Sequence, residues 1–101
     1  MQLKGKTAII TGGGSGFGAS MADLFAKNGA KVIVADIDVD SARKVAEGTG
    51  GYALEVDVSN AKSVEQMKID IFKDHEKIDI VVNNAGTVSY THLTLPTTVF
   101  V

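Results

Sequence analysis

Glycines cluster near the start of the chain, where they could bind an anion. The apolar run 7–10 leads into Thr11-Gly-Gly-Gly-Ser-Gly-Phe-Gly18, and a helical pattern begins inside that stretch. A pyrophosphate needs backbone N–H groups at close range and the positive end of a helix dipole, and glycine permits this approach because it has no side chain. An ordinary glycine-rich turn is the alternative, but the strand before and the helix after argue against it. The predicted contacts are Gly12, Gly14, Ser15, Gly16, Phe17 and Gly18.

An acidic residue closes the second apolar run, eighteen positions after Gly18. The carboxylate of Asp36 could accept hydrogen bonds from both hydroxyls of an adenosine ribose, and the adjacent Ile37 is predicted to contact the same cofactor. A 2'-phosphate would be repelled, because two unit charges ~5 Å apart at an effective dielectric of ~20 cost about 3 kcal/mol. The loop also offers Ser15 and no Arg or Lys. NAD is therefore favoured over NADP; a helix-capping or solvated turn carboxylate remains the alternative for Asp36.

Apolar runs alternate with helical-period segments, which is typical of a parallel sheet with helices on its faces. Strands are expected at 7–10, 31–35, 52–56 and 78–82. The first helix should end at Asn28-Gly29, the second at Gly48, Gly50 and Gly51, and the third should begin with Ser59 as its N-cap. The expected apolar helix faces are Phe17, Met21, Leu24 and Phe25, then Ala42, Val45 and Ala46, then Val64, Met67, Ile71 and Phe72.

Right-handed crossovers place these strands in the order 3-2-1-4. This is the N-terminal half of a doubly wound, Rossmann-type α/β fold. A complete fold of this kind belongs to the ~250-residue size class. Residues 1–86 are therefore interpreted as one dinucleotide-binding half, with an unpaired outer edge on the fourth strand.

Further motifs follow the third and fourth strands. Together with the glycine loop, Asp57-Val58 and Asn83-Asn84-Ala85-Gly86 resemble the successive motifs of the short-chain dehydrogenase/reductase family, over residues 2–86. The resemblance implies that Asp57 and Val58 contact the adenine ring and that Asn83 ties the fourth strand to the turn after the first. It also implies that Asn84, Ala85 and Gly86 lie along the cofactor. From local sequence alone, Asp57 could be a turn residue and Asn83 a strand-end cap.

The resemblance implies an NAD-dependent oxidoreductase that interconverts a small-molecule alcohol and a ketone by hydride transfer. The family uses a Tyr-x-x-x-Lys pair and an upstream Ser for the accompanying proton. Tyr52 is followed four positions later by Val56, and Tyr90 by Thr94, so no catalytic residue is assigned to this chain. A 3-oxoacyl-carrier-protein reductase, a hydroxyacyl, sugar or polyol dehydrogenase, and a non-catalytic dinucleotide-binding module all remain open.

The overall composition excludes several other classes of function. Ten Lys and Arg residues stand against twelve Asp and Glu, without a basic run that could follow a nucleic acid or an anionic membrane. The chain has no Cys, and His75 and His92 have no partner at metal-ligand spacing, so no metal site is expected. A cytoplasmic protein that does not span a membrane is expected, and the parent enzyme is expected to be a homo-oligomer.

The family pattern stops after Gly86. Residues 88–97 resemble the in-frame translation of a transposase-type sequencing-library adapter, with Thr87 at the junction. Residues 87–101 are therefore interpreted as a non-native tail, and a genuine β-rich tail is the alternative. The codons for 88–97 would distinguish the two.

Overall fold

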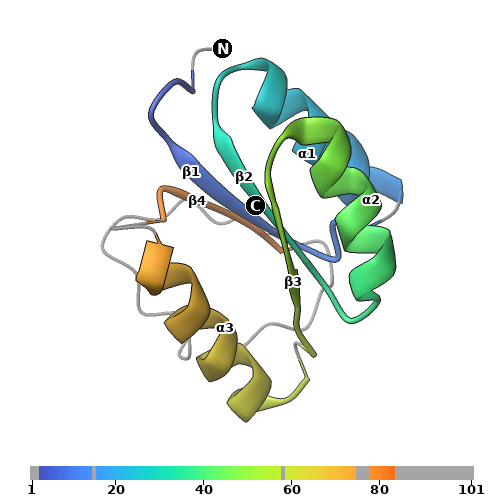
Figure 1. Ribbon diagram of the computed structural model, residues 1–101, viewed down its shortest axis with the longest axis vertical. Coiled ribbons are helices and arrows are strands. Elements are labelled where there is room, and N and C mark those ends of the chain that lie inside the picture. Colours follow the sequence, from blue (N-terminus) through green and yellow to red (C-terminus); the bar gives the residue numbers. More distant parts are fainter. Residues whose placement is uncertain (1–2, 15, 58, 75–77, 84–101) are drawn as a thin grey trace.

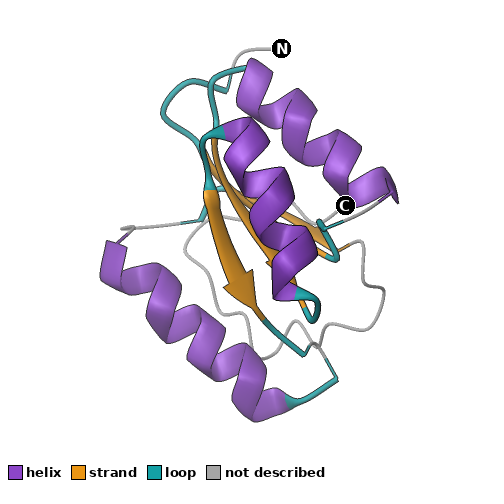
Figure 2. Cartoon of the chain, turned by 45° about the vertical axis from the view of Figure 1, so that its right-hand side comes forward, coloured by secondary structure: helices purple, strands orange, loops and turns teal. Residues whose placement is uncertain are grey.

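The computed structural model describes residues 3–14, 16–57, 59–74 and 78–83. These residues form a four-stranded parallel sheet in the order β3-β2-β1-β4, which confirms the predicted Rossmann-type topology. Helices α1 and α2 cover one face of the sheet and α3 covers the other (Figures 1 and 2). The elements are β1 (Thr7–Thr11), α1 (Gly16–Lys27), β2 (Lys31–Asp36), α2 (Val39–Thr49), β3 (Tyr52–Glu55), α3 (Ala61–Asp74) and β4 (Ile80–Asn83).

The central strands are apolar because both faces of the sheet are covered. Every residue of β1 is buried, and successive side chains point to opposite faces. Ile9 joins the cluster under α3, whereas Ala8 and Ile10 join the cluster under α1 and α2. The α3 cluster also holds Ile33, Ala35, Val56, Val64, Met67, Ile71, Ile78 and Val81; the other holds Leu3, Ala22, Phe25, Val32, Val34, Ala42, Ala46 and Val82.

Of two predicted helix boundaries, the end of α2 is confirmed at Gly50 but not at Gly48, and the N-cap of α3 is wrong. Gly48 lies inside α2, and the helix ends at Thr49 because Gly50 adopts the left-handed conformation with φ +72°. Ser59 is not the N-cap of α3, since its hydroxyl donates to Asp57 and the side chain of Asn60 accepts from the Ser63 N–H at 3.1 Å. The predicted stop of α1 before Gly29 is confirmed.

The predicted strand bounds shift slightly. β1 and β2 each extend one residue further, and β3 ends at Glu55. The fourth strand begins at Ile80 rather than at 78, although Ile78 and Asp79 are buried just before it. The Thr7 N–H donates to Asp79 Oδ2 and the Asp79 N–H donates to the Thr7 carbonyl, both at 2.9 Å. These two bonds fix the amino end of β4 against β1.

Two glycines near the end of α2 should respond in opposite ways when each is replaced by alanine: one replacement should lower the free energy of unfolding and the other should raise it. A Cβ on Gly51 would overlap the Val32 carbonyl oxygen, whereas a Cβ on Gly48 would meet nothing within 4 Å. In the full-length protein, Gly51→Ala should lower the free energy of unfolding by about 1–3 kcal/mol, because backbone atoms must move. Gly48→Ala should raise it by about 0.5–1 kcal/mol. Thermal unfolding checks both, and equal midpoints for the two variants would contradict the packing described.

Across the ranges that the structure describes, no helix combines the length and apolar character needed to cross a bilayer.

Candidate functional site

Most of the described candidate residues gather at the carboxyl edge of the sheet. The register pairs Thr11 at the end of β1 with Ala35 on one side and with Asn83 on the other. Asp36 at the end of β2 pairs with Glu55 at the end of β3. The chain leaves this edge after Thr11, and α1 starts at Gly16. Ligands of open parallel sheets bind in this region, outside the carboxyl ends of the strands.

The glycine loop is fastened to β2 and packed over the sheet. The Gly12 N–H donates to the Ala35 carbonyl at 2.7 Å, and Gly12 has a φ of +67°. A Cβ on Gly13 would lie 2.9 Å from Val34 Cγ1 and 3.0 Å from the Ile10 carbonyl oxygen. Gly13 was not a predicted site residue, and the structure gives it a packing role that lets the loop lie close to the strands. Gly18 is also buried, on the inner face of α1.

The amino end of α1 is exposed to solvent. Gly16 is exposed, has a φ of +57° and would carry a Cβ that meets nothing within 4 Å. The next residue, Phe17, is 67% exposed. The first turn of α1 contains no acidic residue, so none within that turn offsets the positive end of the helix dipole. This arrangement fits an anion such as a phosphate.

Asp36 lies directly beside the glycine loop. Its Oδ2 accepts from the Gly14 N–H at 2.9 Å, and its Oδ1 accepts from the Asp38 N–H at 3.1 Å. The carboxylate is half-buried. The structure thus brings together the two sequence motifs that were predicted separately, the anion loop and the acidic end of β2.

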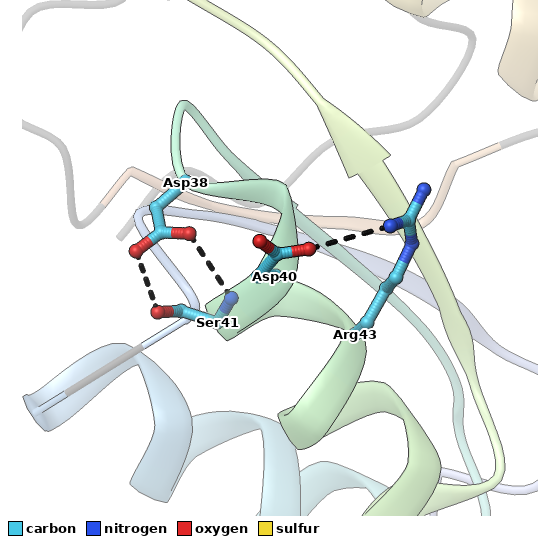
Figure 3. A network of polar contacts seen from close by, with 4 residues as sticks. All are labelled: Asp38, Asp40, Ser41 and Arg43. Carbon is cyan, nitrogen blue, oxygen red and sulfur yellow. Dashed lines mark hydrogen bonds and ion pairs between the residues drawn. The ribbon is translucent and has the colours of Figure 1, made fainter.

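The cap of α2 is Asp38 and not Asp36. Asp38 Oδ1 accepts from the Ser41 N–H at 3.2 Å, and its Oδ2 accepts from the Ser41 hydroxyl at 2.8 Å (Figure 3). These hydrogen bonds, the side-chain one first, lower the pKa of the Asp38 carboxyl. Asp40, in the first turn of α2, pairs separately with Arg43 at 3.4 Å (Figure 3). Two alternatives were left open for Asp36, a helix cap and a turn carboxylate. Helix capping is wrong, because Asp38 fills that role. A turn contact is present, because Asp36 Oδ1 accepts from the Asp38 N–H.

Asp57 follows β3 and organises a turn. Its Oδ1 accepts from the Ser59 hydroxyl at 2.6 Å and from the Ser59 N–H at 3.0 Å. Its own N–H donates to the Ser63 hydroxyl at 2.8 Å, which connects the turn to α3. The turn role that the local sequence left open for Asp57 is thus present in the structure, and contact with an adenine ring stays a prediction.

The turn at Asp57 predicts a measurable titration. The side-chain hydrogen bond from Ser59, followed by its backbone hydrogen bond, lowers the pKa of the Asp57 carboxyl. Ser59→Ala should raise that pKa toward the usual aspartate value, because the hydroxyl donor is lost. Since the folded-state pKa is the lower one, this contact stabilises the fold above the unfolded-state pKa and is lost as pH falls through the folded-state pKa. NMR titration of the Asp57 carboxyl carbon checks the shift; an unchanged titration curve would contradict the contact.

Several predicted contacts lie outside the described residues, namely Ser15, Val58, Asn84, Ala85 and Gly86. Ile37 is described and is 66% exposed immediately after β2. Within the same ranges, no three His, Cys, Asp or Glu side chains are grouped to hold a metal ion. A shallow hollow of about 450 Å³ lies at the other end of the sheet, between α2 and the amino end of β3, and includes no predicted site residue.

Most of this chain is similar in sequence to known proteins. Residues 6–98 match the family model described as short chain dehydrogenase. Tropinone reductase-like 1 from Erythroxylum coca is 44% identical over 89 residues, which cover 86% of this chain and 33% of that protein. The match to the family model extends beyond Gly86 into the segment interpreted as a non-native tail, and that interpretation stays a prediction.

Two solved structures are similar in fold and differ in their bound cofactor. A 3-ketoacyl-(acyl-carrier-protein) reductase from Brucella melitensis, complexed with NADH, superposes with a TM-score of 0.74 at 44% identity, covering 80% of this chain and 34% of that one. RhlG from Pseudomonas aeruginosa, in an NADP complex, superposes with a TM-score of 0.79 at 28% identity, covering 89% of this chain and 38% of that one. The chain spans about a third of the length of these relatives.

Proposed function

This chain belongs to the short-chain dehydrogenase family, and we propose that it is the NAD-binding half of an oxidoreductase that interconverts an alcohol and a ketone. The observation that carries the proposal is the contact between Gly14 and Asp36, 2.9 Å from N–H to Oδ2. This contact holds the Asp36 carboxylate, which we propose accepts from the ribose hydroxyls, beside the glycine loop that leads to α1. A dinucleotide needs both features, because its pyrophosphate and its adenosine ribose are covalent neighbours.

The chain's own residues divide the work of binding. The backbone around Gly12 and Gly16, with the amino end of α1, holds the pyrophosphate. Asp36 accepts from the ribose hydroxyls, Ile37 lies beside the same ribose, and Asp57 faces the adenine. Phe17 and Gly18 complete the first turn of the helix. The proposed contacts outside the described residues are Ser15, Val58, Asn84, Ala85 and Gly86.

The nicotinamide ring, when bound, supplies or accepts the hydride of this reaction. The part played by this chain is to orient the dinucleotide through its pyrophosphate and ribose, which lowers the entropic cost of reaching a reactive geometry. The proton requires a tyrosine with a lysine four positions later, and neither Tyr52 nor Tyr90 has one. We place that pair in the remaining two thirds of a full-length protein.

The preference for NAD rests on charge. The solved relatives carry NADH in one case and NADP in another, so the local residues must decide. Asp36 is an acidic residue beside the glycine loop, and no Arg or Lys stands in that loop. A 2'-phosphate next to this carboxylate would cost about 3 kcal/mol at ~5 Å and an effective dielectric of ~20, more than a hundredfold in affinity.

A 3-oxoacyl-carrier-protein reductase is the second candidate. The similarity to the reductase from Brucella melitensis, at 44% identity and with NADH bound, favours it. Such an enzyme would also transfer a hydride from the nicotinamide to a ketone, but to one carried on a thioester. Both candidates therefore share the cofactor site described above.

Cofactor titration of the full-length protein tests the proposal. We expect NAD to bind at least tenfold more tightly than NADP, and we expect NADH to be consumed with a ketone or a 3-oxoacyl thioester. A full-length sequence without Tyr-x-x-x-Lys would instead indicate a non-catalytic dinucleotide-binding module. Tighter binding of NADP than of NAD would refute the assigned role of Asp36.

A further inference from the structure

The carboxylate of Asp36 joins two segments that belong to different parts of the site. Gly14 belongs to the loop between β1 and α1, and its N–H donates to Asp36 Oδ2 at 2.9 Å. Asp38 precedes α2, and its N–H donates to Asp36 Oδ1 at 3.1 Å. The backbone of Asp36 is itself held, because its carbonyl accepts from the Val56 N–H at 3.0 Å. One side chain on a fixed backbone therefore connects the anion loop with the start of α2.

Gly14 is required by space and not by backbone conformation. It is absent from the described residues with positive φ. A Cβ at Gly14 would nevertheless lie 2.7 Å from Asp36 Oδ2, 2.8 Å from Ser41 Cβ and 3.1 Å from the Ala42 nitrogen. The carboxylate is flexible and could swing away, but Ser41 Cβ and the Ala42 nitrogen are fixed to α2. Moving the carboxylate alone therefore does not make room for a side chain at this position, because the glycine loop or the start of the helix must also shift.

We propose that Gly14 and Asp36 form a latch that couples the pyrophosphate and ribose subsites. This inference rests on the proposed function and adds a positioning role for Gly14 within the glycine loop. The single N–H of Gly14 is used by Asp36, so Gly14 is a positioning residue rather than a donor to the pyrophosphate. The carboxylate keeps the loop folded over the amino end of α1, and the loop keeps the carboxylate turned toward the ribose.

The hydrogen-bonding capacity of the carboxylate permits both roles. An ionised carboxylate has about four lone-pair positions, of which the two backbone N–H groups use two. The other two match the two ribose hydroxyls. An asparagine at this position could still accept from Gly14 through its one oxygen, while the exposed Asp38 N–H turns to water. An alanine could do neither.

This difference makes Asp36→Asn and Asp36→Ala a matched pair, since both variants lack the charge and only one retains the latch. The probe is inorganic pyrophosphate, which has no ribose, added to the full-length protein and followed by NMR. We expect the asparagine variant to bind pyrophosphate about fivefold more tightly than the alanine variant, the effect of one hydrogen bond. Amide exchange at Gly14 should be at least fivefold faster in the alanine variant. Equal affinities together with equal exchange rates would overturn the latch.

Substitution of the glycine tests the latch from the other side. Gly14→Ala should weaken NAD binding at least tenfold, whereas the control Gly48→Ala, in open space on α2, should leave it unchanged. NAD binding by Gly14→Ala equal to that of the unaltered protein would contradict the inference. If this variant fails to fold, the Asp36 pair decides.

The two proposals fail in different ways. If the unaltered protein binds neither NAD nor NADP, the proposed function is wrong, and Gly14 amide exchange in the Asp36 pair still decides the latch. If it binds NAD and the Asp36 pair behaves alike in both measurements, the latch is wrong and the proposed function stands.

Discussion

Replacing Asp36 with alanine and Ile37 with arginine should shift the cofactor preference of the full-length protein toward NADP by at least tenfold. The alanine removes the repulsion of a 2'-phosphate, and the arginine offers it a bidentate partner. Ile37 is 66% exposed directly after β2, so a longer side chain meets no packing obstacle there. The measurement is the ratio of the two dissociation constants, because loss of the bond to Gly14 should weaken the binding of both cofactors.

A neighbouring aspartate provides the control for charge alone. The Asp40 side chain is 84% exposed and pairs with Arg43 on the surface of α2. Asp40→Ala removes the same charge from the same acidic stretch but leaves the contact between Gly14 and Asp36 intact. It should leave the ratio within about twofold of the original, since exposed charges are strongly screened. An unchanged ratio in the Asp36 and Ile37 variant would show that Asp36 does not face the ribose.

The 101-residue chain by itself should not consume NADH with any ketone, even at saturating cofactor. Hydride transfer to a carbonyl needs a proton at the oxygen, and this chain has no tyrosine followed four positions later by a lysine. Absorbance of NADH in the presence of a ketone panel is the measurement, with the full-length protein as the positive control. Turnover by the short chain that disappears with Tyr90→Phe would assign the catalysis to this segment after all.

The strands and their order could be predicted from the sequence because a parallel sheet covered on both faces demands continuous apolar runs. Thr7–Thr11 and Lys31–Asp36 contain such runs, and glycine or aspartate ends each of them. The strand order followed from the handedness of the crossovers, which local chemistry does not change. The position of Asp36 at the carboxyl edge followed from the same topology.

The finer contacts could not be predicted, because several residues were locally competent for each role. Ser59 and Asn60 are both good N-caps, and the choice of Asn60 depends on Asp57 engaging Ser59. Gly14 looked like its neighbours in the glycine loop, yet its N–H points to Asp36 because β2 and α2 lie behind it. The choice at α3 is a competition between local contacts, whereas Gly14 and Asp36 lie 22 residues apart in the sequence, so no local pattern predicts their bond.

The central place of β1 has a consequence for the nascent chain. Ala8 pairs with Val32 on one edge and with Ile80 on the other, so the second partner is synthesised 48 residues after the first. At about 5–20 residues per second, this edge of β1 waits on the order of seconds for β4. Closing the longer loop also costs about 1 kcal/mol more in chain entropy. During that interval this apolar strand edge is unpaired and offers its backbone N–H and C=O groups to a strand of another chain.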